Sequence, residues 1–212
     1  MIKILAADIG FRSTGMAIFR FTAWGWELFD TKCVHTNQAH TVRIIKNGRR
    51  VKRRTDSVVC DDIRRTEFLA TEISNYFITN QCSFMACELP HGGAQSAQAQ
   101  KAMSAAVTMI AVVRLFLQCG WQQVTPNESR AAAGWDKGAH AIPPGLSKQE
   151  HKQALTSRTK ELKAFVMSAM SEKYPIITGL PVVDKEHIAD ALATFEHARN
   201  CDSIKELEND AT

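Results

Sequence analysis

Hydrophobic and polar positions along the chain follow two spacings, one typical of strands and one typical of helices. Short apolar runs bounded by turn residues predict strands over residues 2–8, 15–22, 25–33, 82–88 and 121–124. Apolar residues that recur every three or four positions predict helices over residues 57–79, 94–118, 149–173 and 185–199. The first three strands follow one another as hairpins, and the later strands alternate with helices. This order predicts an α/β fold with a mixed five-stranded sheet and helices on both faces.

The 212 residues suit a single domain, which we expect to span residues 1–200. Two segments interrupt the pattern and look like insertions. One is basic and covers about 41–56, and the other, at about 134–148, is rich in Gly, Pro and Ser. Residues 201–212 carry several acids and are expected to form a frayed acidic tail without a function.

Composition narrows the class of protein. Apolar residues make up 45% of the chain, and the six cysteines show neither a CxxC pair nor the spacing of metal ligands. They are typical of reduced thiols in a cytoplasmic protein. The longest apolar stretch, residues 105–117, contains Thr108 and Arg114 and is shorter than the ~20 residues of a membrane span. We therefore expect a buried helix there and no contact with a membrane.

Positive charge is concentrated between Arg43 and Arg54, where seven of twelve residues are basic and none is acidic. Asn47-Gly48 at the centre of this segment predicts a hairpin turn. The segment can be a solvated hairpin, or it can bind a polyphosphate. The density of positive charge favours a nucleic-acid partner, because each phosphate contact releases counterions. The candidate DNA contacts in this segment are Arg49, Arg50, Arg53 and Arg54.

Two predicted strands end in an acid after an apolar run. Asp8 closes the first strand, and Glu88 closes the strand over residues 82–88. A buried carboxylate costs several kcal/mol unless a positive group meets it, and a divalent metal ion can fill that role. If the two strands are neighbours, both carboxylates emerge at the same edge of the sheet, where sites in α/β proteins tend to lie.

The last predicted helix offers two further ligands. His187 and Asp190 are three residues apart and therefore lie on one helix face, and Asp184 is a plausible cap for that helix. A ligand set dominated by oxygen favours Mg²⁺ or Mn²⁺ over zinc. Two such ions about 4 Å apart can activate a water and stabilise the leaving oxygen of a phosphodiester.

Several motifs resemble the RuvC group of Holliday-junction resolvases, in the ribonuclease H-like superfamily. Residues 8–15, DIGFRSTG, match the D-x-G-x-x-x-T-G opening of that group. Cys87-Glu88 ends the fourth main strand, the segment from Gly93 to Ala97 leads into a helix of small residues, and His187-Ile188-Ala189-Asp190 is similar to the closing acid pair. The likeness spans roughly residues 2–198.

The resemblance implies a homodimeric, metal-dependent endonuclease that cuts four-way DNA junctions symmetrically with two Mg²⁺ or Mn²⁺ ions. The metal ligands that it implies are Asp8, Glu88, His187 and Asp190. A nuclease must also attract phosphate, so further basic residues are expected on the same side as the acids: Arg12, Lys101, Arg130, Lys160 and Lys163.

The chain departs from the family pattern at several places. The basic segment after the third strand is longer than the family pattern leads us to expect, and the loop from Gly134 to Ser147 looks like an insertion. Leu89-Pro90-His91 stands where the family can offer an aromatic residue that stacks at the junction centre. His91 either stacks on a base or has no role in binding. These departures bear on the choice of branched DNA more than on the nuclease chemistry.

Two other functions fit parts of the sequence. Asp8-Ile9-Gly10 followed by Thr14-Gly15 also resembles the first phosphate loop of actin-like and sugar-kinase ATPases, although those proteins use two such domains and a second Gly-rich loop. A DNA-binding protein without catalysis on the same fold is the other alternative. Metal-dependent cleavage without ATP turnover separates the nuclease from both.

Overall fold

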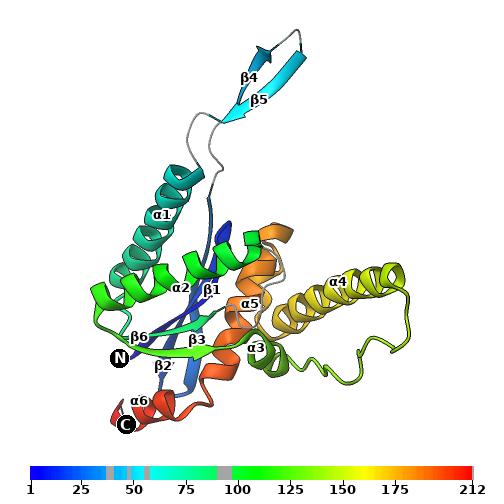
Figure 1. The fold of residues 1–212 in the computed structure, drawn as a ribbon. Helices are drawn as coiled ribbons and strands as arrows, with labels where there is room; N and C mark the ends of the chain where they lie inside the picture. The colour runs from blue at the N-terminus through cyan, green and yellow to red at the C-terminus, as the bar shows by residue number, and fades with distance from the viewer. Residues whose placement is uncertain (37–40, 47–48, 55–57, 90–96, 212) are drawn as a thin grey trace.

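The computed structural model describes residues 1–36, 41–46, 49–54, 58–89 and 97–211. Its centre is a five-stranded sheet in the order β3-β2-β1-β6-β7 (Figure 1). Neighbours in the first half, β3 (Gly25–His35), β2 (Ser13–Thr22) and β1 (Lys3–Ile9), pair antiparallel. β6 (Phe84–Glu88) pairs parallel with β1, and β7 (Gly120–Val124) pairs parallel with β6. The predicted mixed five-stranded sheet is confirmed.

Helices cover both faces of the sheet, as the sequence predicts, because successive side chains of a strand point to opposite faces. The odd positions Leu5 and Ala7 of β1 face α1 (Val58–Thr79) and α2 (Ala97–Leu117). The even positions Ile4 and Ala6 face a second core. That core contains residues of α4 (Lys148–Lys173), η1 (Pro175–Ile177), α5 (Val182–Ala198) and α6 (Asp202–Ala211).

The apolar helix α2 is buried along one side only, whereas the sequence predicted a buried helix. Ala106, Met109, Ile110 and Val113 pack on the sheet, whereas other apolar residues of the helix face outwards. By length and hydropathy the segment Gln100–Leu117 could also cross a membrane. The core helices of other proteins are often just as long and apolar, so length and hydropathy alone are weak evidence for a membrane segment. In this chain 22% of the segment is buried.

The basic insertion forms a hairpin, as predicted. β4 (Thr41–Lys46) and β5 (Arg49–Arg54) pair antiparallel as a separate two-stranded sheet. Figure 1 shows this hairpin standing clear of the main sheet. Since β3 runs parallel to β1, its last residue, His35, lies at the edge of the sheet where β1 and β6 also end. The chain therefore leaves for the hairpin from the edge that carries Asp8 and Glu88.

Two helices begin with a capping box, in which the side chains of the N-cap residue and of the residue three positions later each accept a hydrogen bond from the other residue's backbone N–H. Thr125 and Glu128 form this box at α3 (Pro126–Ala132), and Ser147 and Glu150 form it at α4. α5 differs from the expectation, because it begins after Pro181 and not at Asp184. Asp184 lies inside the first turn, and its carboxylate contacts His35 instead of capping the helix.

The loop insertion is anchored to α4 by an edge-on contact between aromatic rings. Residues 133–147 contain turns but no helix or strand. Trp135 is buried, stacks on the ring of His140 at a centroid distance of 3.8 Å, and meets Phe165 of α4 edge-on. The loop is thus tied down at its start.

The expectation of a frayed tail is wrong for residues 202–211, which form α6. Ile204 is fully buried in the core with α5, and the indole N–H of Trp26 donates a hydrogen bond to Glu208. An amphipathic helix of ten residues can be missed in an acidic sequence because its few apolar positions carry the packing.

Candidate metal centre

The two strand-end acids lie side by side. Asp8 of β1 and Glu88 of β6 are direct partners in the parallel register, at the carboxyl ends of both strands. Each continues the even-numbered positions that face α5, after Ile4 and Ala6 in β1 and after Phe84 and Ala86 in β6. The pleat therefore directs both carboxylates toward α5.

Helix α5 comes close to the sheet at a glycine. Gly15 of β2 is the register partner of Asp8, and a Cβ atom built there would lie 2.0 Å from the carbonyl oxygen of His187. Any side chain would push the helix away from the sheet. The close approach places the Nδ1 atom of His187 3.1 Å from Oδ2 of Asp8. The Thr-Gly of the opening motif thus has a packing role in this chain.

Asp190 lies one turn further along α5. Burial, together with the negative charges of Asp8 and Glu88, raises the pKa of Asp190 well above its ordinary value. No side chain in the described part of the chain donates a hydrogen bond to this carboxylate. The charge of Arg130 opposes the shift. Such a group is stable as an anion only when a cation joins it.

The pKa of Glu88 is also raised, but a hydrogen bond to its carboxylate opposes part of the shift. Burial and the charge of Asp8 raise its pKa to about 7. The hydroxyl of Ser129 donates a hydrogen bond to its Oε2 atom, and Arg130 adds a favourable charge. Both residues come from α3, whose capping box starts it directly after β7. Ser129 was not among the predicted site residues. The Thr125-x-x-Glu128 signature predicts the helix start that places it there.

His187 is the one basic member of this carboxylate centre, which we define as Asp8, Glu88, His187 and Asp190. Its hydrogen bond to Asp8 raises its pKa, and burial acts in the opposite direction. In the absence of a metal ion the imidazole therefore balances part of the charge of Asp8. The structure brings together all four residues that the sequence analysis singled out as ligands.

The predicted DNA-binding residues are spread over several elements. Arg130 lies beside the carboxylate centre, and Lys163 of α4 pairs with Glu186, the residue before His187. Lys101 of α2 pairs with Asp62 of α1, and Arg12 is exposed in the turn after β1. The side chains of Arg49, Arg50, Arg53 and Arg54 and the whole of His91 lie outside what the structure describes.

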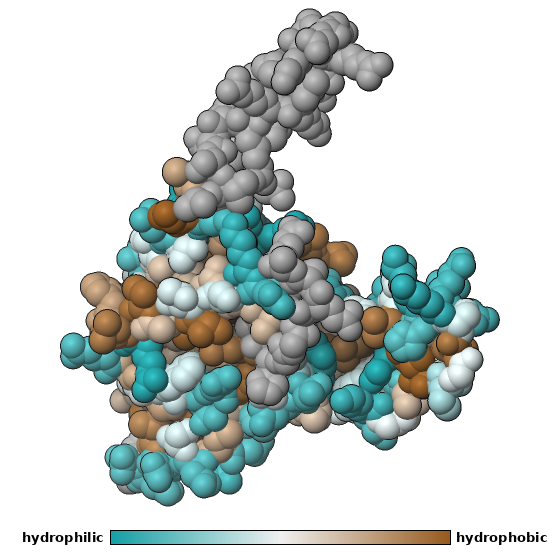
Figure 2. Space-filling view, in the orientation of Figure 1, coloured by the Kyte–Doolittle hydropathy of each residue, from teal (hydrophilic) through white to brown (hydrophobic). Residues whose placement is uncertain are grey.

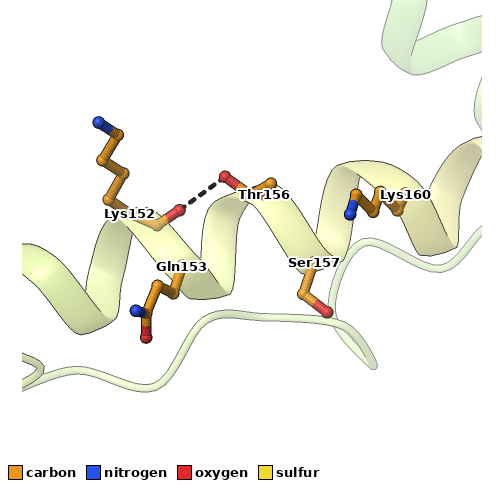
Figure 3. A pocket seen from close by; sticks show the side chains of 5 residues that line it. All are labelled: Lys152, Gln153, Thr156, Ser157 and Lys160. Carbon is orange, nitrogen blue, oxygen red and sulfur yellow. Dashed lines mark hydrogen bonds between the residues drawn. The ribbon is translucent and has the colours of Figure 1, made fainter.

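Lys160 lines a shallow hollow along α4 (Figure 3). The other lining residues are Lys152, Gln153, Thr156 and Ser157. Gln153 and Ser157 project from one side of the helix and Lys152 from the other, and the hydroxyl of Thr156 donates to the carbonyl of Lys152 over 2.9 Å. The hollow contains no acid, so it is not the candidate catalytic site.

The donor set fits hard divalent cations. Three carboxylates and one imidazole, all partly or largely buried, supply mainly oxygen ligands, and Mg²⁺ and Mn²⁺ prefer oxygen. Burial and mutual repulsion raise the pKa values of Glu88 and Asp190, and a divalent ion would relieve the repulsion.

No protein-family model matches the sequence, and no curated protein matches it. Several solved structures are similar to the structure of this chain. Thermus thermophilus RuvC in complex with a Holliday junction substrate has a TM-score of 0.54 and 11% identity over 93% of this chain and 96% of that one. A second Thermus thermophilus RuvC structure gives the same TM-score, with 12% identity. The Fowlpox virus resolvase bound to Holliday junction DNA is more distant, with a TM-score of 0.45 over 94% of this chain. The chain thus shares the ribonuclease H-like fold of RuvC.

Proposed function

We propose that this protein is a metal-dependent endonuclease that cuts branched DNA, with Holliday junctions as the first candidate substrate. One observation carries the proposal. Asp8 and Glu88 stand opposite each other in the parallel register, and α5 brings His187 and Asp190 against them at the Gly15 contact. Buried acids gathered at the ends of two strands repel one another and cost free energy, which a bound cation would offset.

Asp8, Glu88, His187 and Asp190 would hold one or two Mg²⁺ or Mn²⁺ ions. When bound, these ions supply activation of a water and stabilisation of the leaving oxygen of a phosphodiester. The hydroxyl of Ser129 orients the Glu88 carboxylate. Arg130 brings positive charge to the edge where the scissile phosphate must approach.

Several basic segments leave the sheet at the same strand ends that carry the carboxylate centre. The basic hairpin leaves the sheet there after His35, and Arg12 lies in the turn between β1 and β2. We propose that these residues, with Lys163 and Arg130, contact the DNA backbone, while Lys160 extends the contact along α4. His91 and Lys101 remain candidates for the junction centre and its flanks.

Two symmetric cuts require two active sites, which a homodimer supplies. Apolar residues exposed on the α1–α2 side support such an interface: Ile63, Phe68, Ile78, Val107, Val112, Leu115 and Phe116. Figure 2 shows hydrophobic residues gathered over α2 on the face turned to the viewer. Patches of this kind mark association surfaces. We also propose a cytoplasmic location, where the thiols of the six cysteines would stay reduced.

The test is cleavage of a labelled four-way junction and a matched linear duplex in Mg²⁺, Mn²⁺ or EDTA. The wild-type protein is expected to cut the junction with either metal and not in EDTA. Asp8→Asn, Glu88→Gln and Asp190→Asn should each lose cleavage by at least about 100-fold and keep DNA binding. His187→Ala should be milder, because imidazole adds a ligand but no negative charge.

Asp210→Asn is the matched control, since this acid is exposed on α6, and it should cut normally. Normal cleavage by Asp8→Asn would refute the metal-centre assignment. Metal-independent junction binding without any cut would indicate a non-catalytic DNA-binding protein. Turnover of ATP would favour the ATPase alternative.

A further inference from the structure

A second cluster of metal-ligating side chains lies beside the carboxylate centre. The Sγ atom of Cys33, the imidazole of His35 and the carboxylate of Asp184 present ligand atoms that all lie within 4.8 Å of one another. Among the residues that the structure describes, no other group of three or more such side chains has its ligand atoms this close together. The rings of His35 and His187 are 6.4 Å apart, so the two centres are neighbours.

The fold explains why these three residues meet. Cys33 and His35 are two residues apart on β3, so both side chains point to the same face of the sheet. Cys33 is the register partner of Gly15, the residue at which α5 crosses the sheet. That crossing carries the first turn of α5, with Asp184, over the end of β3.

The orientation of His35 is that of a metal ligand. Its Nδ1 atom lies 2.8 Å from the hydroxyl of Ser13, a buried residue of β2. Its Nε2 atom faces the other two ligands, 3.6 Å from Cys33 Sγ and 2.6 Å from Asp184 Oδ1. Histidines that bind metals are usually held in this way, by a hydrogen bond at the ring nitrogen that does not bind the metal.

The spacing suits a tetrahedral ion after a small adjustment. Zn–S bonds of about 2.3 Å and Zn–N or Zn–O bonds of about 2.0 Å place two ligand atoms of one zinc roughly 3.2–3.8 Å apart. The distance between Cys33 Sγ and His35 Nε2 already lies in that range. The His35 and Asp184 ligand atoms, 2.6 Å apart, would separate by about 0.6 Å or slightly more as the ion replaces their shared proton.

We propose that Cys33, His35 and Asp184 form a binding site for a borderline-soft divalent cation of the Zn²⁺ class, distinct from the carboxylate centre. A thiolate together with imidazole selects Zn²⁺ or Co²⁺ over Mg²⁺. Water completes the fourth position, because His35 and Asp184 keep 41% and 31% of their side-chain surface exposed. Loading the site ties β3 to the first turn of α5, three residues before His187. The assignment does not depend on the nuclease proposal.

The experiment is titration of the reduced full-length protein with Co²⁺, followed by competition with Zn²⁺. A thiolate-to-cobalt charge-transfer band reports Cys ligation directly and is blind to the carboxylates. We expect one equivalent of Co²⁺ to produce the band in the wild-type protein and Zn²⁺ to abolish it. Cys33→Ser should remove the band, and Asp184→Asn and His35→Gln should weaken binding at least tenfold.

Two controls make the result specific. Cys201→Ser changes another partly exposed thiol and should show the same charge-transfer band as the wild type, as should Asp190→Asn in the carboxylate centre. Thermal melting without metal shows whether each variant is folded. A wild-type protein without the band, or a band that survives in Cys33→Ser, overturns the assignment. A band that is unchanged in folded Asp184→Asn and His35→Gln also overturns it.

Discussion

At the scale of single residues, protons and a metal ion compete for the carboxylate centre. Without a cation, burial and the neighbouring acid raise the pKa of Glu88 to about 7, burial and two neighbouring acids raise that of Asp190, and the bond to Asp8 raises that of His187. All three groups thus hold protons more tightly in the folded chain than in the unfolded one. A metal ion must displace these protons to bind.

The pH dependence of stability follows from these shifts. Because the folded protein binds more protons, its free energy of unfolding without metal falls as the pH rises. For Glu88 the loss begins near the ordinary value of 4.5 and is complete above about 7. We expect a loss on the order of 2 kcal/mol between pH 5 and 8, and a metal affinity at least tenfold higher at pH 8 than at pH 6. Urea unfolding and calorimetric titration measure the two quantities.

Asp190→Asn provides the control for this prediction. It removes one buried negative charge, so the metal-free variant should be more stable than the wild type at pH 8 and bind Mg²⁺ more weakly. If the metal-free wild type gains stability between pH 5 and 8, the three groups do not hold protons in the way described.

At the scale of elements, the contact between β2 and α5 sets the position of half of the carboxylate centre. Gly15→Ala puts a methyl group against the backbone of His187 and must move α5. We expect a loss of about 3 kcal/mol in the free energy of unfolding and a loss of cleavage well beyond what that instability explains, since His187 and Asp190 move away from Asp8. Thermal melting and single-turnover cleavage check both effects.

Gly179→Ala is the matched control, because a Cβ atom at that glycine meets nothing within 4 Å. It should melt and cut like the wild type. A Gly15→Ala variant with normal Mg²⁺ affinity would show that the close crossing is unimportant for the metal ligands.

The basic hairpin of β4 and β5 is an element with its own prediction. Changing Arg49, Arg50, Arg53 and Arg54 to Gln should weaken DNA binding across sequences and reduce the slope of log affinity against log salt by up to about 3–4. The melting temperature should not change, because the hairpin forms a sheet of its own. Fluorescence anisotropy at several salt concentrations measures the slope, with Lys205→Gln on α6 as a control. An unchanged slope would make the segment a solvated hairpin.

The elements also show what the sequence could and could not predict. Strand-end acids after apolar runs predict the pairing of Asp8 with Glu88, because neighbouring parallel strands end at one edge. The tight group of Cys33, His35 and Asp184 could not be predicted, since it depends on where α5 crosses β3. The start of α5 differs from the prediction because Asp184 is a good capping residue by type, whereas the helix begins directly after Pro181. α6 was missed because Ile204 is one of few apolar positions among many acids.

At the scale of the whole molecule, the proposed homodimer should dissociate when a charge is placed in its apolar interface. Phe116 on α2 is 70% exposed beside a groove between α1 and α2. Phe116→Glu should convert a dimer into a monomer and replace paired cuts across the junction by single nicks. Light scattering after gel filtration and analysis of the junction products measure both.

Ile176 offers an equally exposed apolar residue away from that side, with 71% exposure in η1. Ile176→Glu should leave the dimer intact. A wild-type protein that is monomeric both alone and on a junction would refute the homodimer.

The parallel register of β1 and β6 also has a consequence for how the chain folds. Their pairing joins residues about 80 positions apart, such as Ile4 and Phe84, whereas β1, β2 and β3 close as local hairpins. Such distant pairing costs loop entropy and comes late. We therefore expect the carboxylate centre, which needs this pairing and α5 as well, to form only after the rate-limiting barrier. Mg²⁺ should therefore leave the refolding rate unchanged and slow unfolding, in stopped-flow experiments with and without the ion. Faster refolding in Mg²⁺ would place the metal ligands in the folding nucleus instead.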